Sequence, residues 1–286
     1  MIRPDFCIIG ATKSATSWLH LCLVKHPDIE AVSNETYYLT EHFEEGNRYL
    51  RKYAAAHTGN RVFGDYSNDY ILYHERSIPN MLQLNPEMKV IACLRNPVDR
   101  AYSFYRMWFR AAKVGDDLME AVVPGNRMYD EGFYYHHLQQ FITALGRDRV
   151  HVVLFDDIKD QPATVAHEVY RFLDVDDAFR PDVLGEAYNN APKFRPKSVK
   201  LHKFFAHAMD NFAHTGSFGR KVKETLRRSP LKKYYHKLNK GVDVPPLTIQ
   251  QKQYLQNAYR EDVSKLSQML DRDLLDLWGF TTVRSS

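Results

Sequence analysis

The sequence predicts an α/β fold, a three-layer sandwich in which helices cover both faces of a mainly parallel sheet of about five strands. Residues 6–10 form an apolar run that passes through a loop of small residues into a helical segment. Residues 89–94 form a second apolar run, which is followed by Pro97 and another helical segment. Helical patterns alternate with three further strand-like runs, at residues 29–33, 61–65 and 149–155. Such alternation is typical of parallel sheets with crossover helices.

The loop after the first run has the features of an anion-binding site. The strand ends at Gly10, a lone lysine follows at Lys13, and two hydroxyl residues, Thr16 and Ser17, stand at the start of the next helix. A helix N-terminus presents free backbone N–H groups and a partial positive charge, to which Lys13 adds a full charge. We therefore expect this P-loop-like turn to bind a phosphate or a similar anion.

The spacing of this loop argues against an ATP or GTP hydrolase. The Walker A pattern is G-x-x-x-x-G-K-[ST], with the lysine directly before the hydroxyl residue. Here Lys13 comes three residues after Gly10, Ala15 stands where a second glycine would be expected, and two residues separate Lys13 from Thr16. A nucleotide or small-molecule kinase with a degenerate loop stays open as an alternative.

A second phosphate motif follows the run at residues 89–94. Arg95 stands at the carboxyl end of this strand, where ligands gather in open α/β sheets. Pro97 suits the first turn of the next helix, because its missing N–H would have no intrahelical partner there. Ser103 then lies about two turns into that helix. The planar guanidinium of Arg95 can meet two phosphate oxygens at once.

Together, the two motifs resemble those of the sulfotransferase family, whose donor is 3′-phosphoadenosine 5′-phosphosulfate (PAPS). The order G-x-x-K-[SG]-x-T-[ST] is similar to the family's 5′-phosphosulfate loop, and L-R-[ND]-P-x-[ED]-R-A-x-S-x-Y is similar to its 3′-phosphate motif. The resemblance extends more loosely over most of residues 5–280. It implies that Arg95 and Ser103 bind the 3′-phosphate of PAPS. It also implies that the 5′ end is held by Lys13, Ser14, Ala15, Thr16 and Ser17.

Residues 34–39, N-E-T-Y-Y-L, resemble a family element whose glutamate is the general base. The resemblance implies that Glu35 removes the proton of the acceptor hydroxyl, while Lys13 steadies negative charge on the leaving group. A carboxylate in a partly desolvated cleft suits this role. His42 is the second candidate for the base, because some cytosolic members of the family use a histidine.

The chain departs from the family pattern at residues 65–70, D-Y-S-N-D-Y. Many members that sulfate carbohydrates have E-K-S/T-P here, with the lysine near the transferred group. Tyr66 stands in place of that lysine, and Asn68 stands in place of the proline. Either Lys13 alone neutralises the leaving group, or a second cation comes from elsewhere in the chain.

Basic residues gather in the last third of the chain. From Lys193 to Lys240 there are fourteen Lys or Arg residues against two acids, although the whole chain has a formal net charge of only +4. This excess suits an anionic nucleotide, an acidic glycan or a membrane surface, and equally a solvated helical face. The resemblance implies that a loop in the region of residues 176–196 covers the nucleotide, with Arg195 and Lys197 as candidate contacts.

Length and composition bound the remaining features. We expect a single domain over residues 1–286, whose basic helical part, residues 193–286, packs on the rest. The first strand begins too early for a signal peptide, and no apolar run approaches the roughly 18 residues of a membrane span, so we expect a cytoplasmic protein without a transmembrane segment. The cysteines lack metal-type spacing, and the adjacent His136 and His137 would point about 100° apart on a helix. We therefore expect no metal.

These observations predict a sulfotransferase that moves a sulfuryl group from PAPS to an acceptor hydroxyl and releases 3′,5′-bisphosphoadenosine (PAP), without a metal. The expected acceptor is carbohydrate-like or a small metabolite, with lipids left open, and no nucleic acid is expected as a partner. Besides the kinase, a non-catalytic module that only binds the nucleotide stays open. The oligomeric state cannot be read from the sequence.

Overall fold

The computed structural model describes residues 2–54, 61–185, 194–198 and 240–280. Its centre is a five-stranded sheet in the order β2-β3-β1-β4-β5, in which every neighbouring pair is parallel. The strands are β1 (Phe6–Gly10), β2 (Ile29–Ala31), β3 (Val62–Tyr66), β4 (Lys89–Leu94) and β5 (Val150–Leu154). The predicted α/β fold with a central parallel sheet is confirmed.

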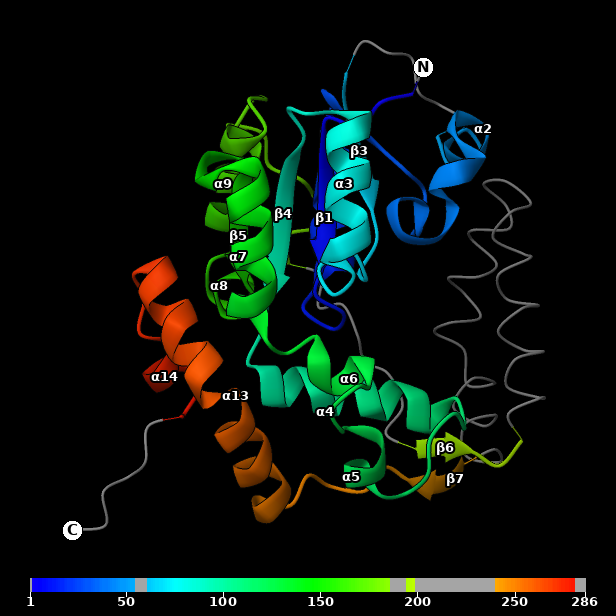
Figure 1. Ribbon diagram of the computed structural model, residues 1–286, viewed down its shortest axis with the longest axis vertical. Helices are drawn as coiled ribbons and strands as arrows, with labels where there is room; N and C mark the ends of the chain where they lie inside the picture. Colours follow the sequence, from blue (N-terminus) through cyan, green and yellow to red (C-terminus); the bar gives the residue numbers. More distant parts are fainter. Residues whose placement is uncertain (1, 55–60, 186–193, 199–239, 281–286) are drawn as a thin grey trace.

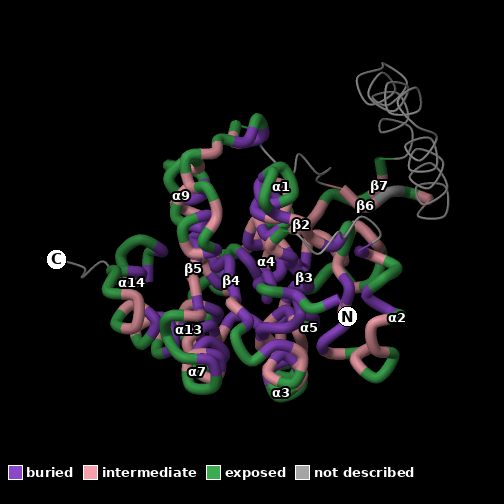
Figure 2. The backbone as a smooth tube through the Cα atoms, turned by 90° about the horizontal axis from the view of Figure 1, so that it is seen from above, coloured by how far each residue is buried: buried purple, intermediate pink, exposed green. Residues whose placement is uncertain are grey.

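Helices cover both faces of this sheet. The longer ones near the strands are α1 (Thr16–Lys25), α3 (His74–Leu84), α7 (Tyr134–Leu145), α9 (Pro162–Phe172) and α13 (Ile249–Leu270). Figure 2 shows α1 and α9 on one side of the strands and α3, α7 and α13 on the other. The shorter helical elements are α2 (Asn47–Leu50), α5 (Leu118–Ala121), α6 (Arg127–Asp130), α8 (Phe155–Asp160), α14 (Leu274–Leu277), η1 (Tyr38–His42), η2 (Phe43–Glu45) and η3 (Arg147–Arg149).

Helix α4 (Pro97–Arg110) runs across the carboxyl end of the sheet (Figure 1). It begins where the sequence predicts, because Asn96 caps it: the Asn96 Oδ1 accepts the N–H of Val98 at 3.0 Å, and Pro97 occupies the first helical position. The helix therefore lies at the same edge of the sheet as the loop that follows β1. The loop after β1 and the start of α4, which lie far apart in the sequence, therefore meet at this edge.

The apolar run at β1 is buried along its whole length, as the sequence predicts. A glycine at position 64 lets β3 pack against it, because a Cβ there would lie 2.1 Å from the Phe6 ring. Cys7, Cys22 and Cys93 are free thiols in this core. The long C-terminal helix starts at its predicted cap, where Thr248 and Gln251 each accept the other's backbone N–H, at 3.2 and 3.0 Å.

Some elements differ from the prediction. The sequences of residues 47–57 and 115–127 suggest a longer helix and an irregular connector, whereas the structure has the short helix α2 ending at Leu50 in the first and α5, leading into α6, in the second. A two-stranded antiparallel sheet of β6 (Phe194–Pro196) and β7 (Lys240–Asp243) was not expected. The basic helices expected over residues 198–239 lie almost wholly outside the described residues, and the single domain stays a prediction. Among the described helices, none combines the length and apolarity needed to cross a membrane.

Candidate functional site

The loop between β1 and α1 has the backbone shape of an anion cradle. Lys13 and Ala15 have φ values of 72° and 68°, and α1 begins directly after them. Left-handed residues at such a turn help to aim neighbouring N–H groups at one spot. Within the described part of the chain, no backbone acceptor takes the N–H groups of Lys13, Ala15, Thr16 or Ser17. These are four of the five residues that the sequence analysis assigned to the 5′ end, whereas the N–H of the fifth, Ser14, donates to the Ala11 carbonyl at 3.2 Å.

Gly10 sets the position of this loop against its neighbours. Its φ is +127°, and a Cβ there would lie 2.7 Å from the Asn68 carbonyl oxygen. The next residue, Ala11, donates its N–H to the Cys93 carbonyl at 2.7 Å. A glycine is therefore required where the loop passes between the ends of β3 and β4.

The second motif lies at the same edge. Arg95 follows β4 directly, its backbone carbonyl accepts the Tyr134 hydroxyl at 2.9 Å, and its guanidinium lies over the Phe155 ring at 4.6 Å. Ser103 is half-buried in α4. Arg106 and Arg110 follow Ser103 by three and seven residues, so they lie on the same helical face.

Positive charge converges on Lys13. Burial lowers the pKa of Lys13, and the nearby guanidinium groups of Arg110, Arg95 and Arg106 lower it further. Burial and Arg106 also lower the pKa of Arg110. In the described ranges, none of these four cations forms a salt bridge with a carboxylate. A group of half-buried cations without anions is costly unless a ligand supplies the negative charge, so these residues fit the two phosphates and the sulfate of PAPS.

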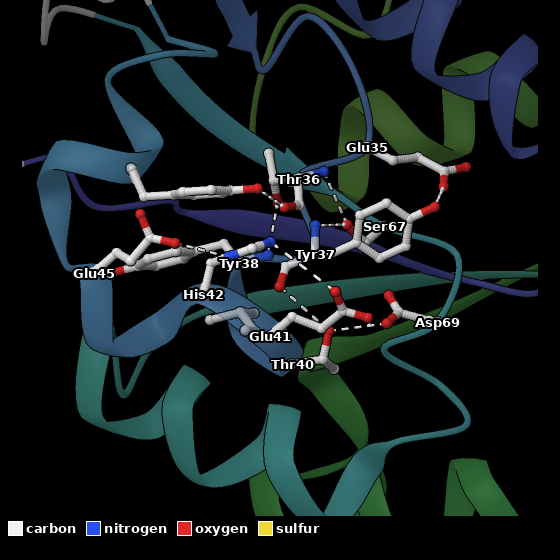
Figure 3. A network of polar contacts seen from close by, with 12 residues as sticks. Glu35, Thr36, Tyr37, Tyr38, Thr40, Glu41, His42, Glu45, Ser67 and Asp69 are labelled. Carbon is white, nitrogen blue, oxygen red and sulfur yellow. Dashed lines mark hydrogen bonds and ion pairs between the residues drawn. The ribbon is translucent and has the colours of Figure 1, made fainter.

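Glu35 lies in the turn after β2, facing the same edge. Its two carboxylate oxygens accept hydrogen bonds from Asn68 Nδ2 and from the Tyr37 hydroxyl. Ser67 Oγ accepts the backbone N–H of Tyr37 at 2.7 Å, which fixes the turn. In Figure 3 the Tyr37 hydroxyl points at Glu35, whereas His42 points at Glu45. Burial and the hydrogen bond to Glu35 raise the pKa of Tyr37, so its phenol stays a donor to the carboxylate.

Tyr66 connects the phosphate loop to Glu35. Its hydroxyl lies 3.3 Å from Thr16 Oγ1, 3.5 Å from Ser17 Oγ and 3.3 Å from Asn68 Nδ2, and Asn68 donates to Glu35. Burial raises the pKa of Tyr66, so the hydroxyl is neutral. The residue that stands in place of the family's lysine is thus a hydrogen-bonding bridge without charge.

Residues 126–131 contribute side chains that sequence reasoning did not assign to the site. Arg127 Nη2 donates to Thr12 Oγ1 at 2.7 Å, and Arg127 Nε donates to Glu131 Oε2 at 3.2 Å. Glu131, which is fully buried, also accepts the backbone N–H of Thr12. Arg100 Nη1 lies 3.6 Å from the same carboxylate. No local sequence pattern predicts these contacts, because Thr12 lies more than one hundred residues before Arg127 and Glu131 in the sequence.

The remaining candidates have other partners. His42 Nδ1 lies 2.8 Å from Glu45 Oε1, and its ring stacks on Tyr49 with centroids 4.2 Å apart. Arg195 donates to the carbonyls of Phe109 at 3.0 Å and Val114 at 2.7 Å, so its guanidinium holds the C-terminal end of α4. Lys197 is exposed. The structure thus groups Lys13, Arg95 and Glu35 at one edge and gives His42 and Arg195 other contacts.

The histidines of α7 meet a third histidine that the sequence analysis did not consider. His137 Nδ1 lies 3.3 Å from His74 Nδ1, and the His136 ring is 5.8 Å from that of His74. Burial lowers the pKa of His137 to about 4. Over the described residues, no group of three or more His, Cys, Asp or Glu side chains has a geometry that could hold a metal ion.

Comparisons with known proteins agree with this geometry. The family described as "Sulfotransferase domain" matches residues 3–243. The chain is 25% identical over 299 residues to the bifunctional heparan sulfate N-deacetylase/N-sulfotransferase 4 of Mus musculus, in an alignment that covers 94% of this chain and 30% of the relative. It is 27% identical over 150 residues to the membrane-associated sulfotransferase kil1 of Dictyostelium discoideum, covering 46% of this chain and 32% of the relative. The aligned part of this chain therefore spans less than two thirds of the length of these relatives.

A solved structure supports the fold. The crystal structure of a sulfotransferase from Alicyclobacillus acidocaldarius superposes with a TM-score of 0.67 at 20% sequence identity. The superposition covers 98% of this chain and 100% of that one. The similarity is one of architecture over the whole length.

Proposed function

The chain belongs to the sulfotransferase domain family, and on this basis we propose that it is an enzyme that moves a sulfuryl group from PAPS to an acceptor hydroxyl. One observation carries the proposal. Lys13 and Arg95 come from two loops far apart in the sequence, yet they lie close enough for the charge of one to lower the pKa of the other. Two ends of one bisphosphorylated nucleotide can therefore be held together. Lys13 and the N–H groups up to Ser17 would hold the 5′ end, and Arg95 with Ser103 the 3′-phosphate.

The chemistry follows from the position of Glu35. Its carboxylate accepts the proton of the acceptor hydroxyl. The acceptor oxygen forms a bond to sulfur as the bond between sulfur and the 5′-phosphate oxygen breaks, and the electrons of that bond leave with PAP. Lys13 and the N–H groups of the loop stabilise the charge that collects on the leaving oxygen. Tyr37 and Asn68 keep the Glu35 carboxylate oriented through their hydrogen bonds.

The names of several relatives, heparan sulfate N-sulfotransferases, favour a carbohydrate acceptor, while N-sulfation in those proteins places the sulfuryl group on an amine and not on a hydroxyl. We propose a carbohydrate-like alcohol as the acceptor, with a small metabolite or a lipid as the next possibilities. The two alternatives from the sequence are less well supported, because neither a kinase nor a pure binding module accounts for the family match together with Glu35 at the edge of the site. The cytoplasmic location stays a prediction, which fractionation of producing cells can test.

Two measurements test this function. Calorimetry with PAP should show binding in the absence of magnesium, whereas a kinase would require magnesium and ATP. Radiolabelled PAPS mixed with the protein and a panel of desulfated glycosaminoglycan fragments, glycolipids and phenols should label one class of acceptor. A protein that binds neither PAP nor PAPS would contradict the proposal, and one that binds PAP but labels nothing, in the panel or in a cell extract, would favour the binding module.

A further inference from the structure

Position 66 holds a tyrosine where the resemblance gives a lysine, so this position brings no positive charge to the site. The Tyr66 hydroxyl reaches Thr16, Ser17 and Asn68, so it occupies the space between the phosphate loop and Glu35 without bringing a charge. The three cations around Lys13, which are Arg95, Arg106 and Arg110, all come from the β4 and α4 side of the site. A positive charge on the side of the loop that faces Glu35 has to come from another element.

Arg127 reaches that side from α6. The Asn126 side chain caps this short helix by accepting the N–H of Met128 at 2.9 Å. Two hydrogen bonds, to Thr12 Oγ1 at 2.7 Å and to Glu131 Oε2 at 3.2 Å, fix the plane of the Arg127 guanidinium beside the residue that precedes Lys13. The side chain keeps 23% of its surface exposed, and Nη1 has no acceptor among the described residues.

The charged groups near Arg127 indicate the surroundings of its guanidinium. Burial alone would lower the pKa of Arg127, but Glu131, Asp69 and Tyr37 outweigh burial and raise it. Tyr37 is the residue that donates to Glu35, and Asp69 follows β3 on the same edge. The guanidinium therefore lies against the phosphate loop at Thr12 and near enough to Tyr37 and Asp69 for their charges to act on it.

The pairing with Glu131 does not cancel the positive charge. The same carboxylate lies 3.6 Å from Arg100, whose side chain is fully buried. Two guanidinium groups thus share one carboxylate. Burial raises the pKa of the other nearby acid, Asp69, to about 6, although Thr40 and Arg127 oppose that shift, so Asp69 is still mostly ionised at neutral pH, and the Thr40 hydroxyl donates to its carboxylate at 2.8 Å.

We propose that Arg127 is a further catalytic residue of the sulfuryl transfer, with Nη1 beside the transferred group on the Glu35 side, in the role that the resemblance gives to a lysine at position 66. This inference rests on the proposed function. A fixed cation at that point stabilises charge on the sulfuryl oxygens without reorganising during the reaction. Thr12 and Glu131 act as positioning residues, because they hold the guanidinium against the loop.

The test compares PAPS with PAP, which differ by the sulfuryl group alone. Calorimetry without acceptor measures the affinity of both for the wild-type protein, Arg127→Gln, Arg127→Lys and the double variant Arg127→Gln with Tyr66→Lys. Arg76→Gln is the matched control, because Arg76 is exposed on α3. The expected result is that Arg127→Gln weakens PAPS binding by about tenfold or more, as the loss of one charged hydrogen bond implies, and changes PAP binding by less than about threefold. Turnover should fall by about 10²–10³-fold.

The two variants that carry a new lysine distinguish the loss of a positive charge from a loss of folding. Arg127→Lys keeps the charge and should retain part of the preference for PAPS, and the lysine at position 66 should recover at least about tenfold of the turnover lost in Arg127→Gln. A parallel loss of PAP and PAPS affinity, or no recovery by the lysine at position 66, would overturn the inference and leave Arg127 a support of the loop. If Arg127→Gln is too unstable to purify, Arg127→Lys is compared with wild type instead: its preference for PAPS over PAP should be reduced but not lost, and an unchanged preference or an equal loss for both nucleotides would overturn the inference. A wild-type protein that binds neither nucleotide would instead overturn the proposed function.

Discussion

Replacing Glu131 by glutamine removes one negative charge from the centre of a buried cluster while keeping the shape of the side chain. Glu131 is fully buried, accepts hydrogen bonds from the Thr12 N–H and from Arg127 Nε, and lies 3.6 Å from Arg100 Nη1 as an ion pair. In Glu131→Gln the Arg100 guanidinium stays fully buried without a counterion. Breaking a buried ion pair in this way costs about 3–5 kcal/mol, which is a large part of the roughly 5–15 kcal/mol that stabilises a typical domain.

Equilibrium unfolding in urea measures this loss directly. We expect the midpoint for Glu131→Gln to fall steeply with an unchanged slope, because the loss is in stability and not in the surface exposed on unfolding. PAP affinity should fall as well, since the Thr12 N–H loses its charged acceptor and the phosphate loop loosens. Glu168→Gln is the control, because Glu168 is exposed on α9. A loss below about 1 kcal/mol would refute the reasoning, because it would place the cluster in the range of exposed pairs.

Three further predictions follow from the site and the core. Glu35→Gln should lower turnover by about 10²–10⁴-fold and leave PAP affinity within about threefold, because the base acts on the acceptor and not on the nucleotide; equal losses in both would argue against its role as the base. Arg95→Gln should weaken PAP binding by about 10–100-fold in calorimetry, as expected for a charged hydrogen bond to phosphate, and unchanged binding would remove Arg95 from the nucleotide site. Burial lowers the pKa of His137 to about 4, whereas a histidine in the unfolded chain has a pKa of about 6.5. As the pH falls, the unfolded state therefore binds the proton first. The free energy of unfolding should drop by about 3 kcal/mol between pH values of about 6.5 and about 4. In His137→Gln this part of the pH dependence should disappear, and an unchanged dependence would show that other groups cause it.

The sequence was sufficient for the sheet and for the ends of its central strands. The apolar runs at β1 and β4 are buried on both faces, so they read as strands without alternation. β1 ends at Gly10, a residue type that permits a positive φ, and β4 is followed by Pro97, whose φ is fixed. The caps at Asn96 and Thr248 are equally local signals. Elements that depend on distant partners were missed. The β6 and β7 strands pair across a long stretch of chain, and neither has a strong strand pattern of its own.

The same distinction holds for the site. Lys13, Arg95 and Glu35 follow strands or precede helices, so the rule that ligands gather at the carboxyl edge is enough to predict that they lie together. Arg127 and Glu131 lie in a short polar stretch whose pattern suggests only a connector. Their contact with Thr12 exists because α4, α6 and the phosphate loop meet in space. Arg195 shows the opposite case, since a cation expected at the nucleotide donates to the carbonyls of Phe109 and Val114.

The pairing of β6 with β7 brings together two short segments that lie far apart in the sequence. Pro196 lies opposite Lys240, and Arg195 fastens this short ribbon to the end of α4. Where the chain leaves and re-enters the described residues, β6 and β7 are therefore held side by side at the C-terminal end of α4.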